Sequence, residues 1–389
     1  MRKKIFLNWQ LNSVSGWGIL GLNIFLHWAN DRDVMPLMGH SIFTDAVYMV
    51  DPLRLSQVSR AIGDSNDFCD RLGRKGGESI GVEATVIDGV FNGFYPSPVF
   101  GQTNIGRCIF ENTKVTELDR KLAKYDALVC GSSWNADILR AHTGREVHVI
   151  LEGIDPSVFC PGPKSGLMNP DNFYIFSGGK IEPRKGQDLV LLAFREFSRK
   201  HPNAFLVTTW HSPWTEFSIG VKGRLDAPLE LDESGKLNVK KWVSDNGIDP
   251  ARVIEIFQIP NQMMPMILRE MDVALQPSRA EACTNLPVKE AMACGLPVIV
   301  AENTGMKDLI AEDNCFPLRK QSPIPDTDDW GSEGWGESDV DEIVEALELL
   351  YADHKRRKAI GTRAAEWILA NRTWQRHASE LKQFVLSVS

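Results

Sequence analysis

Short apolar runs alternate with amphipathic stretches along most of the 389-residue chain. Clusters of apolar residues predict buried strands, and apolar positions that recur every three or four residues predict helices. In the first part of the chain the predicted strands are 5–9, 47–51, 84–89, 127–132 and 147–153, with helices at 116–125 and 135–144. Strands that alternate with helices are typical of parallel βαβ units, so a parallel sheet is expected here.

The same alternation returns after a break at residues 155–172, which are rich in Pro, Gly and Asn and indicate a linker. Segments 215–247 and 322–339 are polar and are predicted as surface insertions, and the last stretch, from Asp341 onward, is almost all helical. Beyond the linker, strands are predicted at 173–179, 204–210, 253–257, 273–278 and 297–303, and helices at 187–200 and 261–271. The pattern therefore predicts an α/β protein of two domains, 1–155 and 156–372, with a ligand-binding cleft between them.

The composition of the chain argues against nucleic-acid-binding, membrane-spanning and secreted proteins. The net charge of −8 and the isoelectric point near 5.6 argue against nucleic acid as a main partner. No apolar run approaches the roughly 20 residues that span a bilayer. The apolar run within the first residues, MRKKIFLNWQ, is too short for a signal peptide. Seven widely spaced cysteines without a Cys-x-x-Cys pair suit reduced thiols. A cytoplasmic protein is expected.

The segment SGWGILG (15–21) carries glycines at the spacing of a dinucleotide-binding fingerprint, at Gly16, Gly18 and Gly21. Two features speak against an NAD site. The loop QLNSVS (10–15) separates the glycines from the preceding strand, and the region VMPLMGHS (34–41) offers no carboxylate for a ribose. We favour a glycine-bearing loop whose backbone passes close to another group.

Two segments of the second half carry the candidate chemistry. The first, FYIFSGGKIEPRKGQDLVLLAF (173–194), reads as strand, glycine loop and helix. A diphosphate needs positive charge and backbone N–H groups at a helix start, and this loop offers both, although lysines in a surface loop are usually only solvated. The residues that would serve are Gly178, Gly179, Lys180, Arg184, Lys185 and Gly186.

The second segment is RAEACTNLPVKEAMACGLPVIV (279–300). A helix is predicted to begin near Pro287 and to end before Gly295, with Thr284 or Asn285 as its N-cap. Glu281 lies in the loop before this helix and Glu290 within it. Their carboxylates can bond the hydroxyls of a ligand, but paired carboxylates alone are a weak signal.

Together the two segments resemble the nucleotide-sugar half of the retaining GT-B glycosyltransferases of family four, the glycosyl transferases group 1. The likeness extends to segments 109–139, 149–161, 256–278 and 373–385. It implies two Rossmann-like domains with an interdomain cleft and a C-terminal helix, 373–389, that returns to the first domain. It also implies that no metal or other cofactor is needed.

The resemblance assigns roles to individual residues. Lys180 and Lys185 would hold the donor's diphosphate, Glu281 the transferred sugar and Glu290 the nucleotide ribose. The two glutamates enclose eight residues here instead of the usual seven, so either Glu281 or Ala282 takes the first position. The further donor-binding residues would be Gly16, Gly18, Gly179, Gln258, Ile259, Cys283, Thr284, Asn285 and Leu286.

On the acceptor side the resemblance offers Trp17, whose ring could stack on a sugar, and Glu111, which stands where family members often have a histidine. The triplet Asp326-Thr327-Asp328 imitates an Asp-x-Asp metal motif, but its Pro- and Asp-rich surroundings predict solvated surface. The eight histidines form no ligand cluster. No metal site is predicted.

The expected activity is transfer of a hexose from a nucleoside-diphosphate sugar, of UDP-glucose type, to a glycan or lipid-linked acceptor in polysaccharide biosynthesis. Peripheral membrane contact through RKLAK (120–124) is a further candidate. Two alternatives stay open: a UDP-sugar epimerase of the same fold, and a non-catalytic subunit that binds nucleotide or glycan. The donor base, the acceptor and the oligomeric state are not predicted.

Overall fold

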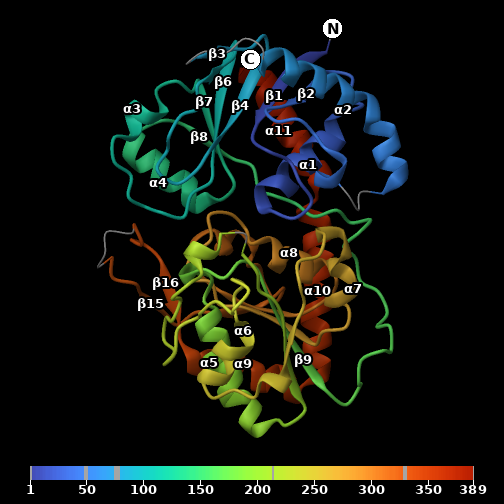
Figure 1. The fold of residues 1–389 in the computed structure, drawn as a ribbon, viewed down its shortest axis with the longest axis vertical. Coiled ribbons are helices and arrows are strands. Elements are labelled where there is room, and N and C mark those ends of the chain that lie inside the picture. The colour runs from blue at the N-terminus through green and yellow to red at the C-terminus, as the bar shows by residue number, and fades with distance from the viewer. Residues whose placement is uncertain (1, 48–50, 74–78, 213, 327–330, 389) are drawn as a thin grey trace.

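The computed structural model describes residues 2–47, 51–73, 79–212, 214–326 and 331–388, and these form two α/β lobes stacked end to end (Figure 1). Each lobe is built on a six-stranded sheet in which all neighbouring strands are parallel. Helices cover both faces of each sheet. The predicted α/β class with two Rossmann-like domains is confirmed. The domain limits given above remain predictions.

The N-terminal lobe has the strand order β2-β1-β4-β6-β7-β8. A small additional sheet pairs β3 with β5. Its elements are β1 (Lys3–Asn8), α1 (Gly16–Trp28), β2 (Val34–Met38), η1 (Thr44–Ala46), α2 (Pro52–Gly73), β3 (Ile80–Gly81), β4 (Thr85–Val90), β5 (Val99–Phe100), β6 (Thr103–Cys108), α3 (Leu118–Leu122), β7 (Ala127–Cys130), α4 (Ser133–Thr143) and β8 (Val147–Val149), where η denotes a short 3₁₀ helix.

The C-terminal lobe has the strand order β11-β10-β9-β12-β13-β14. Its elements are β9 (Phe173–Gly178), η2 (Pro183–Lys185), α5 (Gln187–Lys200), β10 (Ala204–Thr209), η3 (Thr215–Phe217), α6 (Val239–Asp245), η4 (Pro250–Arg252), β11 (Val253–Glu255), η5 (Asn261–Met263), α7 (Met264–Leu268), β12 (Val273–Gln276), α8 (Leu286–Ala293), β13 (Val298–Ala301), η6 (Thr304–Leu309), β14 (Phe316–Leu318), β15 (Gln321–Pro323), β16 (Gly336–Ser338), α9 (Val340–Ala352) and α10 (His354–Asn371). The last helix, α11 (Trp374–Val388), lies in the other lobe.

Each sheet is buried on both faces, which explains why its strands read as continuous apolar runs. In β9, Phe173 and Ile175 belong to one core cluster, whereas Tyr174 and Phe176 belong to the cluster on the opposite face. The strand order of each sheet reverses at one place, between β1 and β4 in the N-terminal lobe and between β9 and β12 in the C-terminal lobe. Such switch points, at the carboxyl ends of the strands, are where open α/β sheets bind ligands.

The chain crosses between the lobes twice, and the two crossings lie side by side. Ile154 on the outward crossing forms a parallel bridge with Thr373 on the return. A side chain at Gly153 would lie 2.2 Å from the backbone of Thr373, so this close approach requires glycine. Beyond the crossing, α11 packs on α1, where the Trp28 indole donates to the carbonyl of Ala378 (3.0 Å) (Figure 1). The predicted return of the C-terminal helix is confirmed.

Several segments differ from the prediction. Strand β6 was not expected because its sequence TNIGRC is largely polar, yet its last four residues are buried within the sheet. Segment 215–247 is not a plain surface insertion, since Leu225, Leu229 and Trp242 belong to the core of the C-terminal lobe. Segment 322–339 contributes to a hairpin of β15 and β16. The predicted strand 47–51 includes residues 48–50, which lie outside the described residues.

Candidate functional site

The carboxyl ends of β9 and β12 meet at the switch point of the C-terminal lobe. The loop after β9 runs through η2 into α5, and the loop after β12 leads into α8. Backbone N–H groups of Arg279 and Ala280 donate to the carbonyl of Arg184 (2.6 and 3.3 Å), which ties the two loops together. Gly186 has a φ of +70° and would place a side chain 2.5 Å from the carbonyl oxygen of Pro277. Only glycine fits this contact between the loops.

Glu281 is the centre of an ionic cluster between the two loops. The ammonium of Lys185 lies 2.8 and 2.9 Å from its two carboxylate oxygens, and the guanidinium of Arg184 lies 3.1 Å away. The amide of Asn285 donates to the same carboxylate at 2.7 Å. Burial by itself raises the pKa of Glu281, but the two cations outweigh burial and lower that pKa to about 2. The carboxylate is therefore ionised at neutral pH.

Arg184 connects this cluster to the N-terminal lobe. Besides Glu281, its guanidinium pairs with Glu182 at 2.7 Å and with Glu111, of the N-terminal lobe, at 3.1 Å. Burial opposes the charge of Arg184, but the three carboxylates hold its pKa above the usual value. Sequence reasoning named Arg184 only as one of three loop cations. The signal that distinguishes it is its place directly before Lys185, which a 3₁₀ turn aims at the same carboxylate.

The sequence analysis places Lys180 beside Lys185 at the diphosphate, but in the structure Lys180 does not contact Glu281. Its ammonium pairs with Glu182 at 2.6 Å and stands 4.7 Å from the ring centre of Trp214. The cation that joins Lys185 on Glu281 is Arg184. Glu111 likewise forms an ion pair, so it does not present an isolated carboxylate to an acceptor. The roles assigned to Lys180, Lys185 and Glu111 stay predictions.

Helix α8 begins where the sequence predicts. Asn285 is the N-cap, and its side chain accepts a hydrogen bond from the N–H of Val288 (3.3 Å). Ala282 is buried and turns its carbonyl to the hydroxyl of Ser132 in the N-terminal lobe (2.5 Å). Because it is Glu281 that faces the cations, the geometry favours the alignment with Glu281 in the first glutamate position.

The other residues predicted at the start of α8 lie in the C-terminal lobe, and two of them face the N-terminal lobe. Thr284 is fully buried, and its hydroxyl has no partner within the described part of the chain. The sulfur of Cys283 approaches Gly131 so closely that a β-carbon there would lie 2.1 Å away. Leu286 faces Gly16 across the interface, 3.9 Å from where that β-carbon would be. Gly179, on the cationic loop, has a φ of +113° that only glycine adopts readily.

Glu290 lies one turn into α8 and is buried. Burial raises its pKa to about 7, although a hydrogen bond from the side-chain amide of Asn261 and the charge of Lys289 lower it. Asn261 directly follows the segment predicted to read a nucleobase, where Gln258 is exposed and Ile259 is half-buried. Sequence reasoning missed Asn261, since an isolated asparagine in a loop gives no signal by itself.

The glycines of SGWGILG do not form an open loop. Ser15 caps α1 by accepting a hydrogen bond from Gly18 (3.2 Å), so the segment is the first turn of the helix. A side chain at Gly18 would lie 2.2 Å from the side chain of Asn12, so this glycine serves local packing. Gly16 is exposed and faces the C-terminal lobe. The assignment of Gly16 and Gly18 as donor-binding residues stays a prediction.

Trp17, whose ring could stack on a sugar, is half-buried in an aromatic cluster. Its ring centre lies 4.5 Å from that of Phe91 and 5.4 Å from that of Trp9. The indole of Trp9 also donates to the carbonyl of Trp17 (3.1 Å). Stacking on a sugar would therefore use only the part of the ring that Phe91 and Trp9 leave open.

Two further expectations concern metals and membranes. Among the described residues no group of His, Cys, Asp and Glu could hold a metal ion. Asp326 accepts a hydrogen bond from Gly331 (3.0 Å), while Thr327 and Asp328 lie outside the described residues. Of the helices that the structure describes, none is long and apolar enough to cross a membrane. In RKLAK, Lys124 is nearly buried against Asp88 (2.9 Å), which leaves a weaker basic patch than the sequence suggests.

Comparisons with known proteins agree with this architecture. Solved structures with the same fold include sucrose-phosphate synthase from Thermosynechococcus elongatus (TM-score 0.66, 16% identity, 100% and 99% of the two chains covered). Another is HepE from Anabaena in complex with UDP (TM-score 0.63, 13% identity, 99% and 100% covered). At these identities the likeness shows the fold.

Curated relatives match at low identity. A GDP-mannose-dependent alpha-(1-6)-phosphatidylinositol monomannoside mannosyltransferase from Mycolicibacterium smegmatis is 22% identical over 60% of this chain and 54% of its own length. A D-inositol 3-phosphate glycosyltransferase from Stackebrandtia nassauensis is 27% identical over 69% and 56%. The chain thus spans about half the length of the curated relatives it matches.

The family comparison falls on the lobe that carries the ionic cluster. Residues 163–317 match the model of the family described as glycosyl transferases group 1. This range contains the cationic loop, Glu281 and Glu290. This part of the chain is therefore similar to the glycosyl transferases group 1 family, and the two lobes have the GT-B fold.

Proposed function

We propose that the chain transfers a hexosyl group from a nucleoside-diphosphate sugar to a hydroxyl of a glycan or lipid-linked acceptor, with retention of anomeric configuration. The observation that carries the proposal is the convergence of Lys185 and Arg184 on Glu281 at the switch point of the C-terminal lobe. A diphosphate presents charged oxygens that suit a planar guanidinium and an ammonium side by side. It would compete with Glu281 for both cations.

This competition gives each group a role. Once the diphosphate engages Lys185 and Arg184, the carboxylate of Glu281 becomes available to accept hydrogen bonds from the hydroxyls of the sugar. Glu281 stays in place because Asn285 donates to it from the helix N-cap. Glu290, buried beside Asn261, would bond the ribose hydroxyls. The backbone N–H groups at the start of α8 add partial positive charge near the phosphates.

The proposed reaction needs no strong side-chain base. The bond from the anomeric carbon to the diphosphate breaks, and a bond from the acceptor oxygen forms on the same face of the sugar. The acceptor's proton passes to the leaving diphosphate oxygen. Lys185 and Arg184 stabilise the negative charge that develops on this leaving group, and preorganised charges of this kind make a large contribution to catalysis.

An experiment identifies the nucleoside base and the sugar of the donor. A donor of UDP-glucose type is proposed, with GDP-mannose as the rival because one relative is named for it. Binding of UDP-glucose, UDP-N-acetylglucosamine and GDP-mannose is measured by calorimetry, and release of nucleoside diphosphate is then followed with glycan and lipid-linked acceptors. Conversion of a donor without any acceptor would indicate an epimerase. Donor binding without turnover in any acceptor mixture would indicate a binding subunit.

The matched variants are Lys185→Ala and Lys355→Ala, because Lys355 is exposed on α10, far along the chain from the cationic loop. We expect the first variant to lose affinity for the diphosphate and the second to bind as the unmodified chain does. Equal donor binding in both variants would overturn the assignment of the site.

A further inference from the structure

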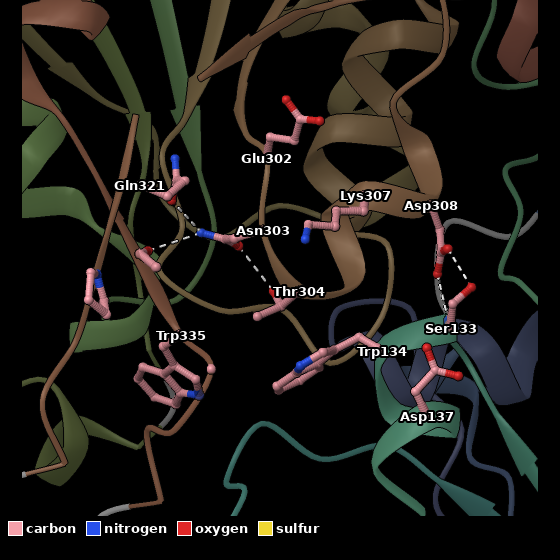
Figure 2. Close-up of a pocket in the computed structure, with 13 residues that line it drawn as sticks. Ser133, Trp134, Asp137, Glu302, Asn303, Thr304, Lys307, Asp308, Gln321 and Trp335 are labelled. Carbon is pink, nitrogen blue, oxygen red and sulfur yellow. Dashed lines mark hydrogen bonds between the residues drawn. The ribbon is translucent and has the colours of Figure 1, made fainter. Parts of the chain in front are cut away.

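A pocket of about 410 Å³ opens between the two lobes (Figure 2). Its lining does not include Glu281, Lys185 or Arg184, although the hydroxyl of Thr304 in the lining accepts a hydrogen bond from the backbone N–H of Glu281 (2.9 Å). The pocket lies between α4 of the N-terminal lobe and η6 and the β15–β16 hairpin of the C-terminal lobe. Pockets of this size between domains are typical of small-molecule sites. The residues that line it are Ser133, Trp134, Asp137, Glu302, Asn303, Thr304, Lys307, Asp308, Gln321, Pro323, Gly334, Trp335 and Gly336.

Two tryptophans from different lobes line this pocket. Trp335 is half-buried, and its indole donates to the carbonyl of Glu111 in the N-terminal lobe (2.9 Å), which fixes its ring. Trp134 is half-buried on α4 and packs on Phe110 with 6.3 Å between ring centres. Its indole N–H has no acceptor in the part of the chain that the structure describes, so it can donate to a ligand. Figure 2 shows both rings bordering the same space.

The polar side chains of the pocket differ in how far they are already engaged. Asp308 accepts hydrogen bonds from Ser133 (2.6 and 2.7 Å), and Glu302 pairs with Arg319 (3.1 Å). Lys307 is exposed, forms no ion pair within the described ranges, and directs its ammonium into the pocket (Figure 2). This side chain can therefore donate to a ligand.

The pocket floor is preorganised. Asn303 is buried, and its amide donates to the carbonyls of Ser278 and Gly336 and to Gln321, at 2.9 to 3.0 Å. These bonds hold the backbone of η6 against the hairpin. A ligand would meet a fixed wall on this side, which lowers the entropic cost of binding.

A sugar ring combines an apolar face of C–H groups with a rim of hydroxyls. The faces of Trp134 and Trp335 can bury the apolar face, since the negative face of an aromatic ring attracts weakly positive hydrogens. The ammonium of Lys307 and the indole N–H of Trp134 can donate to the hydroxyls. The carboxylate of Asp137, which already accepts from Arg140 (3.0 Å), can accept from them with its remaining lone pairs. The charges at the pocket balance, because Lys307 and the two arginines that pair with Asp137 and Glu302 match the three carboxylates of the lining. This balance suits a neutral ligand.

We propose that this pocket binds a neutral saccharide at a second site, apart from the site of the Glu281 cluster. Because its walls come from both lobes, the bound saccharide contacts both and stabilises their present arrangement. The proposal goes beyond the proposed transfer reaction, since saccharide binding here requires no donor and no turnover. The saccharide is a free oligosaccharide or the glycan part of a lipid-linked molecule, and the two sources share this recognition chemistry.

The test uses the full chain and neutral trisaccharides of gluco, manno and galacto configuration, titrated by saturation-transfer NMR and tryptophan fluorescence. At least one trisaccharide should bind with a dissociation constant below about 10 mM, and saturating UDP or GDP should leave this binding intact. Trp134→Ala should weaken it about tenfold or more, as the loss of a central aromatic contact does. Trp134→Phe should weaken it less, because a smaller aromatic face remains.

Trp367→Ala is the matched control, because Trp367 lies on α10 and stacks on Arg372 outside the pocket. It should bind as the unmodified chain does. Lys307→Ala, which removes an exposed side chain, should weaken binding without affecting the fold. Absence of binding by every trisaccharide, or equal binding by the Trp134→Ala variant, overturns the proposal.

The two sources are separated by comparing the best trisaccharide with the same glycan on a lipid in detergent. Equal affinity supports recognition of the saccharide alone, and binding of only the lipid-linked form overturns it. Failure of the proposed transfer is seen separately, as the absence of donor binding or of product. A chain that binds the trisaccharide but no donor would keep this inference and lose the proposed function.

Discussion

The two switch points of the molecule share a topology but differ in chemistry. In the C-terminal lobe, the loop after β9 carries Lys185 and Arg184, which converge on Glu281. In the N-terminal lobe, the corresponding loop after β1 leads to Trp17, which packs on Phe91 after β4. One switch point is thus lined by charge and the other by aromatic rings.

This difference shows what glycines do and do not specify. Glycines lie at both connections, before α5 in the C-terminal lobe and in the first turn of α1 in the N-terminal lobe, and both sets allow close packing. Gly186 makes room for the carbonyl of Pro277, and Gly18 makes room for Asn12. Glycine spacing therefore indicates a tight strand-to-helix connection, whereas the side chains beside it decide whether the connection can hold an anion.

The largest effect is expected from removing charge at the C-terminal switch point. Lys185→Ala should lower turnover by about 10²-fold or more, because it removes a preorganised cation from the leaving diphosphate. Steady-state rates of nucleoside diphosphate release measure this, with Lys355→Ala as the control. Unchanged turnover would mean that the charge at the C-terminal switch point does not contribute to the reaction.

The second-largest effect is expected from Glu290→Gln, which should change how the stability of the protein depends on pH. The pKa of Glu290 is raised by burial to about 7, so the folded chain holds a proton that the unfolded chain releases. This carboxyl therefore favours folding most at low pH, and the contribution is lost as the pH rises from about 4.5 to 7. The difference in the free energy of unfolding between the Glu290→Gln variant and the unmodified chain should therefore change by about 2 to 3 kcal/mol in favour of the variant as the pH rises from 5 to 8.

Urea unfolding at several pH values measures that difference. Glu345→Gln, on the exposed face of α9, is the control and should follow the unmodified chain. Parallel pH profiles for Glu290→Gln and the unmodified chain would show that Glu290 titrates normally.

A smaller effect distinguishes the glycines of the N-terminal switch point. Gly18→Ala should destabilise the chain by about 1 to 3 kcal/mol, because its β-carbon would overlap the side chain of Asn12. Gly16→Ala is the matched control, since its β-carbon would lie 3.9 Å from Leu286. Urea unfolding compares the two free energies. Equal stability of the variants would contradict the packing role of Gly18.

The smallest effect concerns the ion pair that joins the lobes. Glu111→Gln removes one of three carboxylates around Arg184, and Glu182 and Glu281 remain. Because the pair is one of several contacts, the donor dissociation constant should change by less than about threefold. Calorimetry with the preferred donor measures it. A tenfold loss of affinity would place Glu111 at the donor instead.

Much of the fold followed from the chain's local patterns. The strands β9, β12 and β13 are buried on both faces, so their apolar runs were visible. The cap of α8 could be narrowed to Thr284 or Asn285, because short polar side chains precede a proline and an apolar helix, and the structure has Asn285 in this place. Strand β6 was missed because its sequence is largely polar and its burial depends on tertiary contacts: Arg107, almost fully buried, donates to the carbonyl of Ile150.

The candidate site was predictable only in part. Glu281 and Lys185 stood out because a carboxylate and a cation each lay in a loop between a strand and a helix. Which cation reaches Glu281 depends on the direction of the side chains in η2, and the sequence does not give this direction. Asn261 beside Glu290 and Glu111 beside Arg184 are long-range contacts, so no local pattern could reveal them.

By itself, the sequence determined two parallel α/β units, their order, and the loops that carry the candidate chemistry, because hydrophobic periodicity and capping are local properties. The tertiary structure decided which charges meet, that Trp17 is packed among aromatic rings, and that Trp134 and Trp335 border one pocket. These features depend on how the lobes and their loops lie against one another. Contacts between residues distant in the chain set that arrangement, and local propensity does not encode it.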